Sequence, residues 1–181
     1  MRIGIDIDDT ITDTRIRQLI YWKKYFNENP KDGYTEELPE KINDFGDEYI
    51  DKFWDEYRSL MNENPIFIKD SIDTINKLHD LGFEIHIVTA RRKEHHPNLE
   101  KLFIDNNILI DKLSTDIMEK GIHCKENNIS LLIDDNYTNC MNALNSNIDV
   151  ICFGNNYKEF NCLYNWNDVY NYIIDKYYEV E

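Results

Sequence analysis

The sequence has few cysteines, and none of them are closely spaced. The four are Cys124, Cys140, Cys152 and Cys162, no CxxC pair occurs, and the two nearest are ten positions apart. A disulfide framework is not expected for a chain of this length with such spacing. We therefore expect reduced thiols and a cytoplasmic protein.

Basic residues are also scarce. Lysine and arginine number 20 against 35 aspartates and glutamates, which gives a formal net charge of −15. A protein that binds DNA or RNA in general needs a basic face, so this balance argues against stable nucleic-acid binding. It does not exclude a small phosphorylated substrate, which needs only local positive potential from a metal, a lysine or a helix N-terminus.

Long apolar runs are absent as well. A strand-like IGIDI segment follows Met1-Arg2 directly, and no stretch reaches the length of a signal peptide or a transmembrane helix. We expect a soluble protein with no membrane partner. With 41% hydrophobic residues, the 181-residue chain can bury a sizeable core, and its length fits one domain with a modest insertion.

From residue 66 onward, helical and strand patterns alternate. The patterns predict helices over 70–81, 97–106, 121–128, 138–145 and 166–178, and strands over 83–88, 111–114, 129–135 and 149–154. This alternation predicts βαβ units and a parallel sheet, which residues 2–7 would join as the first strand. The expected fold class is α/β, a Rossmann-like parallel sheet with helices on both faces.

The segment 15–65 interrupts this alternation. Helices are expected over 14–28 and 47–62, and the segment is rich in aromatic residues. We expect a small α-helical cap inserted after the first strand, while 1–14 and 66–181 form the core. Most of the cap aromatics would pack the cap itself, and one or two could stack on a nucleobase. These aromatic residues are Trp22, Tyr25, Phe26, Phe45, Phe53, Trp54 and Tyr57.

Acidic and hydroxyl side chains gather where the expected strands end. They are Asp6, Asp8, Asp9 and Thr10 after the first strand, Thr89 after the second, and Asp134 and Asp135 after 129–133, with Lys120 at the start of the helix before that strand. Ligands of parallel α/β sheets bind beyond the carboxyl ends of the strands. Two like charges about 4 Å apart repel by about 4 kcal/mol at an effective dielectric constant of about 20, so the crowding indicates a bound cation. An oxygen-rich, thiol-free set suits Mg²⁺.

This set resembles the four motifs of the haloacid dehalogenase (HAD) superfamily of phosphohydrolases. The first motif, DxDx(T/V) after a strand, is matched by DIDDT at 6–10, and the second by Thr89. The third is a lysine, and the fourth is an acidic pair after a strand, matched by Asp134-Asp135. The insertion after the first motif resembles a type 1 cap. The LLIDD pattern, the short insertion and the late WNDVYNYI segment resemble the 5'(3')-deoxyribonucleotidase-like branch and its uncharacterised bacterial relatives.

The resemblance implies a role for each carboxylate. Asp6 would be the nucleophile that takes up the phosphoryl group, and Asp8 would act as general acid and then general base. Mg²⁺ would be held by the Asp6 carboxylate, the main-chain carbonyl of Asp8 and the fourth motif, with Asp135 as the direct ligand and Asp134 as the outer one.

The resemblance also implies two groups that bind the phosphoryl oxygens, Thr89 and a lysine. Lys120 is preferred because it lies at a helix start near the strand ends. Lys125, in the same expected helix, is the alternative.

The function implied is a Mg²⁺-dependent phosphatase of a small phosphomonoester, with a nucleoside or deoxynucleoside monophosphate as the expected substrate. The mammalian-type nucleotidases usually carry glycine at the position of Asp9 and an apolar residue at that of Thr10, so a phosphatase of another metabolite, or of a polynucleotide 3' end, remains an alternative, with the acidity of the chain weighing against the latter. Asp9 is expected to be a turn residue or an outer group of the site and not a metal ligand. A receiver domain is disfavoured because the order of its aspartates, Thr and Lys differs. A non-catalytic binding protein is disfavoured because it would not require the Asp8 carboxylate.

The sequence alone does not decide the roles of several other polar residues near the strand ends. Arg91 and Arg92 would either contact a substrate phosphate or balance nearby acids. The pair His95-His96 lacks a third metal ligand at useful spacing, and His86 is expected to be a buried, hydrogen-bonded histidine.

Overall fold

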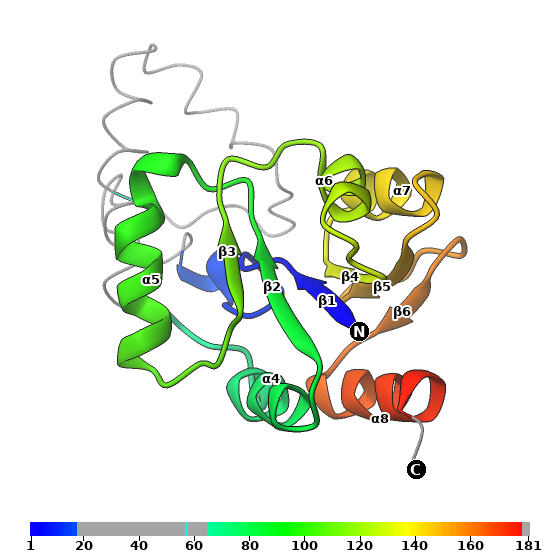
Figure 1. Ribbon diagram of the computed structural model, residues 1–181, viewed down its shortest axis with the longest axis horizontal. Coiled ribbons are helices and arrows are strands. Elements are labelled where there is room, and N and C mark those ends of the chain that lie inside the picture. Colours follow the sequence, from blue (N-terminus) through cyan, green and yellow to red (C-terminus); the bar gives the residue numbers. More distant parts are fainter. Residues whose placement is uncertain (18–56, 58–64, 179–181) are drawn as a thin grey trace. The chain divides into compact units, whose positions relative to one another are not determined.

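The computed structural model describes residues 1–17, 57 and 65–178. Within these residues, six parallel strands form one sheet in the order β3-β2-β1-β4-β5-β6 (Figure 1). The strands are β1 (Arg2–Ile5), β2 (Glu84–Val88), β3 (Lys112–Ser114), β4 (Leu131–Asp134), β5 (Asp149–Phe153) and β6 (Asn161–Leu163). The predicted parallel α/β fold is confirmed.

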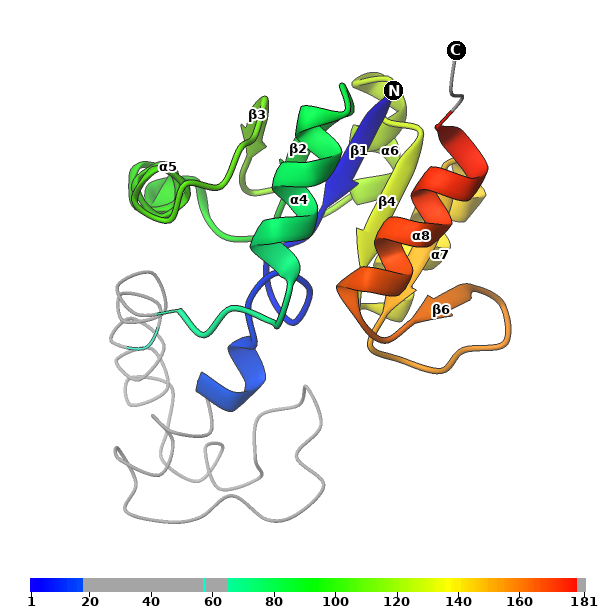
Figure 2. The same ribbon diagram turned by 90° about the horizontal axis from the view of Figure 1, so that it is seen from below.

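Helices cover both faces of this sheet. They are α4 (Ser71–Asp80), α5 (His96–Asp105), α6 (Lys120–Glu126), α7 (Tyr137–Asn145) and α8 (Trp166–Tyr177), with a short 3₁₀ turn, η1 (Lys93–His95), before α5. In both ribbon views α4 and α8 lie on one side of the sheet, and α6 and α7 lie on the other (Figures 1 and 2). Each predicted helix of the core is present, with ends that differ by one or two residues.

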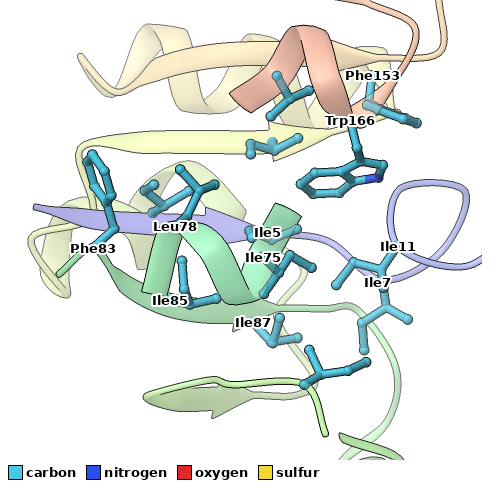
Figure 3. Packing of buried hydrophobic residues seen from close by; sticks show 14 of the residues in the cluster. Ile5, Ile7, Ile11, Ile75, Leu78, Phe83, Ile85, Ile87, Phe153 and Trp166 are labelled. Carbon is cyan, nitrogen blue, oxygen red and sulfur yellow. The ribbon is translucent and has the colours of Figure 1, made fainter. Parts of the chain in front are cut away.

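Side-chain alternation along the strands produces two hydrophobic cores. Leu131 and Ile133 of β4 point to the core shared with α4, α5 and α8, whereas Leu132 points to the core shared with α6 and α7. Neighbouring side chains of a strand face opposite sides, so a strand covered on both faces must be apolar at every position. Figure 3 shows the first core, where Ile75 and Leu78 of α4 pack over the strands.

One strand was not predicted. The edge strand β6 has three residues and pairs with β5 so that Cys162 lies opposite Cys152. A three-residue segment is too short to show a period of two, and its strand conformation depends on pairing with β5. Two predicted strands are shorter in the structure: the strand predicted over 2–7 ends at Ile5, and the strand predicted over 129–135 spans only Leu131–Asp134.

The chain divides into two compact units, Met1–Thr12 with Phe67–Glu181, and Asp13–Ile66. The expected helix over 47–62, most of that over 14–28, and all of the cap aromatics except Tyr57 lie outside the described residues. The cap and its aromatic roles therefore stay predictions. Tyr57 is buried, and its hydroxyl donates a hydrogen bond to the Thr14 carbonyl within the second unit.

Among the described residues, none of the helices has both the length and the apolar character that crossing a bilayer requires.

Candidate active site

The loop after β1 presents the DIDDT residues. The Asp6 N–H donates to the Ile133 carbonyl at 3.0 Å, which continues the β1–β4 register one residue beyond the strand. The Ile7 carbonyl then accepts from the Thr12 N–H and hydroxyl at 2.9 and 3.2 Å, which closes a tight loop. Asp9 lies in this loop with φ of 51°, a left-handed conformation that aspartate tolerates in turns. The predicted turn role of Asp9 is confirmed.

The first residue of α8 holds this loop in place. Trp166 is fully buried, and its indole N–H donates to the Thr10 carbonyl at 3.0 Å. Its ring also packs against Phe153, with centroids 5.6 Å apart (Figure 3). Trp166 therefore packs the first core and in addition fixes the backbone that follows Asp8.

Lys120 joins carboxylates from two strands. Its Nζ lies 2.7 Å from Asp6 Oδ1 and 2.6 Å from Asp134 Oδ2, and its side chain is 2% exposed. Lys125, five residues along the same helix, is exposed. Of the two lysines, the structure therefore brings Lys120 to the strand ends.

Burial and charge determine the ionisation of this pair. Burial raises the pKa of Asp6 to about 7, with Asp134 and Asp8 adding to the rise and Lys120 opposing it. Burial alone lowers the pKa of the Lys120 ammonium, but the carboxylates of Asp6 and Asp134 outweigh it and raise that pKa, so Lys120 is charged. Asp6 therefore needs more positive charge than Lys120 supplies to be fully ionised at neutral pH.

The oxygens of Asp134 are already engaged by nitrogen donors. Oδ1 accepts from the Asn136 N–H at 2.9 Å and the Asn139 amide at 3.1 Å, and Oδ2 accepts from Lys120. Asp134 is fully buried, whereas Asp135 is 8% exposed and its main-chain carbonyl accepts from Asn155 at 2.6 Å. The carboxylate of Asp134 is thus held by protein donors, as an outer role would require, and the direct ligand role of Asp135 stays a prediction.

The carboxylates form a possible cation site. Asp6, Asp134 and Asp135 each offer an oxygen, and these oxygens lie within 4.8 Å of one another. All three donors are hard oxygen ligands, the type that Mg²⁺ prefers, and their combined charge exceeds that of Lys120. The residues present therefore fit Mg²⁺. The Asp8 carboxylate is not part of this cluster, and the ligand role of its main-chain carbonyl stays a prediction.

Thr89 and Arg91 follow β2 beside the loop after β1. Thr89 is fully buried, and its hydroxyl oxygen accepts from the Arg91 N–H at 3.2 Å. The Arg91 guanidinium donates to both carboxylate oxygens of Asp8 at 3.0 and 2.6 Å. Arg92 is exposed and lies 3.6 Å from Glu94. Both arginines thus pair with nearby acids, as one of the two interpretations expected, Arg92 at the surface and Arg91 with a side chain that is 7% exposed.

The histidines are placed outside the carboxylate cluster. His96 Nδ1 lies 3.1 Å from the Thr115 hydroxyl and Nε2 lies 3.4 Å from Glu100. His86 is buried as expected, and burial lowers its pKa. The expectation that it is hydrogen-bonded does not hold at Nδ1, which has no partner among the described residues.

Sequence reasoning missed Asn139. Its amide donates to both oxygens of Asp134, at 3.1 and 3.3 Å, from the first turn of α7. The signal was available, because Asn136 is a capping residue whose side chain accepts from the Thr138 and Asn139 N–H groups. Asn139 is three positions after this N-cap, so it lies in the first turn of α7, close to the end of β4 where Asp134 stands.

Gly121 lets α6, which carries Lys120, pack against α7. A Cβ at this position would lie 2.2 Å from the Asn142 carbonyl oxygen. We expect Gly121→Ala to destabilise the protein by about 1–3 kcal/mol, because the helix must move away from a rigid backbone group. Thermal unfolding measures this loss, with Lys125→Ala on the exposed side of the same helix as the control. Equal melting temperatures for the two variants would show that the helices are not held at this spacing.

Comparison with known proteins gives similarity in structure only. No protein-family model and no curated protein sequence matches the chain. A haloacid dehalogenase-like hydrolase from Streptococcus pneumoniae is similar, with 16% identity and a TM-score of 0.67 over 95% of this chain and 97% of that one. So is a predicted phosphatase from Clostridium acetobutylicum, with 15% identity and a TM-score of 0.69 over 96% and 98%. YfnB from Bacillus subtilis, whose structure has bound magnesium, has 14% identity and a TM-score of 0.66 over 95% and 97%. The chain therefore has the fold of the HAD-superfamily hydrolases.

Proposed function

We propose that the protein is a Mg²⁺-dependent phosphomonoester hydrolase that works through an aspartyl-phosphate on Asp6. The observation that carries this proposal is the group of Asp6, Asp134 and Asp135 at the carboxyl ends of two strands, with Lys120 joining Asp6 to Asp134. Aspartate as a covalent nucleophile needs nearby positive charge, both to stay ionised and to receive a phosphorylated substrate.

The residues divide the reaction into two steps. An Asp6 oxygen attacks phosphorus, the bond to the leaving oxygen breaks, and Asp8 gives its proton to that oxygen. Asp8 then takes a proton from water, whose oxygen attacks phosphorus and releases phosphate from the Asp6 carboxylate. The Lys120 ammonium and the Thr89 hydroxyl stabilise the charge on the phosphoryl oxygens in both steps.

Mg²⁺ would be held by the carboxylates of Asp6 and Asp135 and the main-chain carbonyl of Asp8. When bound, it supplies positive charge to the phosphoryl oxygens and to Asp6. Support comes from the oxygen-only ligand set and from YfnB, a protein of similar fold that binds magnesium.

We expect Mg²⁺ to bind more weakly as the pH falls below about 7. Burial raises the pKa of Asp6 to about 7, so in acid a proton occupies the ligand and must leave before the metal binds. The dissociation constant should rise about tenfold per pH unit on the acid side, with proton release on binding. Calorimetry near pH 6 and near pH 8 measures both quantities. In Asp6→Asn this pH dependence should be absent, and equal wild-type affinity at the two pH values would contradict the role of Asp6.

We propose a nucleoside or deoxynucleoside monophosphate as the substrate. Support comes from the sequence resemblance to the nucleotidase-like branch, carried by LLIDD at 131–135, and from the aromatic residues between 22 and 57. A phosphatase of another small metabolite would use the same carboxylates.

A phosphate-release assay tests the function and the substrate together. The panel holds nucleoside and deoxynucleoside 5'- and 3'-monophosphates, sugar phosphates and an aryl phosphate, each with Mg²⁺ and with a chelator. We expect Mg²⁺-dependent release that is fastest for the nucleotides and absent in Asp6→Asn. Preferred release from sugar phosphates would remove the nucleotide assignment and keep the mechanism. No release from any substrate would overturn the proposal in favour of a binding protein.

A further inference from the structure

Arg91 holds the carboxylate of Asp8 by two parallel hydrogen bonds. Nε donates to Oδ2 at 3.0 Å and Nη2 donates to Oδ1 at 2.6 Å. A bidentate guanidinium pair defines the plane of a carboxylate as well as its position. Asp8 needs such a partner more than Asp6 does, because 34% of its side chain is exposed and packing holds it less firmly.

Arg91 is itself held on a defined backbone. Its side chain is only 7% exposed, so the guanidinium is largely withdrawn from solvent. Its N–H donates to the Thr89 hydroxyl, and its carbonyl accepts from the Asp116 N–H at 2.7 Å. The Thr89 carbonyl accepts from the Ile117 N–H at 3.0 Å, so the loop after β2 is tied twice to the segment that leads to Lys120.

We propose that Arg91 is the positioning residue for Asp8, and that it acts through this carboxylate and not on the substrate. The inference rests on the proposed function, in which Asp8 serves as general acid and general base. Arg91 holds the carboxylate with its exposed side available to the leaving oxygen and then to water. A buried cation whose fork is aimed at one carboxylate is poorly placed to serve as a surface counter-charge or as a phosphate ligand.

This role predicts a dependence on the leaving group. An alkoxide leaves phosphorus only with a proton from Asp8, whereas p-nitrophenolate is stable enough to leave without one. Misplacing Asp8 should therefore slow the first step for alkyl phosphates and spare it for p-nitrophenyl phosphate. A general loss of structure would slow both substrates equally.

The test compares Arg91→Gln with Arg92→Gln, the same substitution at the adjacent exposed residue. For the best alkyl phosphate of the panel, we expect Arg91→Gln to lose about 10–100-fold in kcat, with KM changed by less than about threefold. The rate of the first burst of p-nitrophenolate should stay near the wild-type value. Arg92→Gln should match the wild type throughout. Arg91→Lys, which keeps the charge and loses the fork, should recover only part of kcat.

The double variant Asp8→Asn/Arg91→Gln shows whether Arg91 acts only through Asp8. We expect its kcat to equal that of Asp8→Asn, because two residues that act as one unit are not additive. A further loss in the double variant would overturn the inference, as would equal loss on both classes of substrate or a change in KM alone.

The outcomes separate this inference from the proposed function. No hydrolysis by the wild type overturns both. Hydrolysis by the wild type with Arg91→Gln equal to Arg92→Gln overturns only the positioning role. If Arg91→Gln does not fold, as judged by thermal unfolding, the same comparison of leaving groups is made with Arg91→Lys.

Discussion

Asp6→Asn is expected to lower turnover by more than about 10³-fold on every substrate, because an amide oxygen cannot form and release the acyl phosphate. The buried position of Asp6 makes the substitution mild for the fold. Burial already raises the pKa of this carboxyl to about 7, which means that the fold disfavours a negative charge at this position. The neutral amide of asparagine avoids the cost of burying that charge. The side chain keeps its size, and Lys120 keeps Asp134 as a partner.

The matching measurement is steady-state kinetics with thermal unfolding of the same samples. We expect a melting temperature at or above that of the wild type with no turnover. A variant that retains more than about a tenth of the wild-type kcat would show that another residue is the nucleophile.

Lys120→Met is expected to have the largest effect on stability. It leaves the carboxylates of Asp6 and Asp134 buried without their shared cation, and breaking a buried ion pair in this way costs about 3–5 kcal/mol. Chemical denaturation measures the loss. Lys125→Met, an exposed position of the same helix, is the matched control and should lie within about 0.5 kcal/mol of the wild type.

The pH dependence of this variant has a defined sign. Without Lys120, the pKa of Asp6 is raised further in the folded state, so its protonated form is the one that the fold tolerates. Stability is then retained below the unfolded-state pKa of Asp6 and is lost as the pH rises toward the folded-state value. Equal stability of Lys120→Met and Lys125→Met near neutral pH would contradict the central position of Lys120. Activity should also fall in Lys120→Met, since the phosphoryl oxygens lose a cation.

Topology explains why much of the site could be predicted from the sequence. Asp6, Thr89 and Asp134 each follow a β-rich segment, and the carboxyl ends of parallel strands meet at one edge of the sheet. Lys120 was predictable as the first residue of a helix that leads to β4. For the short side chains of Asp6, Thr89 and Asp134 the backbone alone sets the position, whereas for Lys120 the backbone places only the start of its long side chain near the strand ends.

Contacts made by side chains across loops could not be predicted in the same way. Arg91 has four side-chain torsions, and nothing in the spacing shows whether its guanidinium points to solvent, to a substrate or to Asp8. The role of Asp134 depends on hydrogen bonds from Asn136 and Asn139. These bonds can be predicted only if the first residue of α7 is known without error. Gly121 is a similar case. The clash that a Cβ at this position would make with the Asn142 backbone becomes visible only once α6 is packed against α7.

The central claim is that Asp6 becomes phosphorylated, and chemical trapping tests it most directly. The enzyme is mixed with its best substrate and Mg²⁺, quenched in acid and reduced with borohydride, which converts an aspartyl-phosphate to homoserine. Peptide mass spectrometry should then find homoserine at position 6 in the wild type, and more of it in Asp8→Asn if water attack slows more than phosphorylation. Substrate turnover with unmodified Asp6, or homoserine at Asp8, Asp134 or Asp135 instead, would contradict the account.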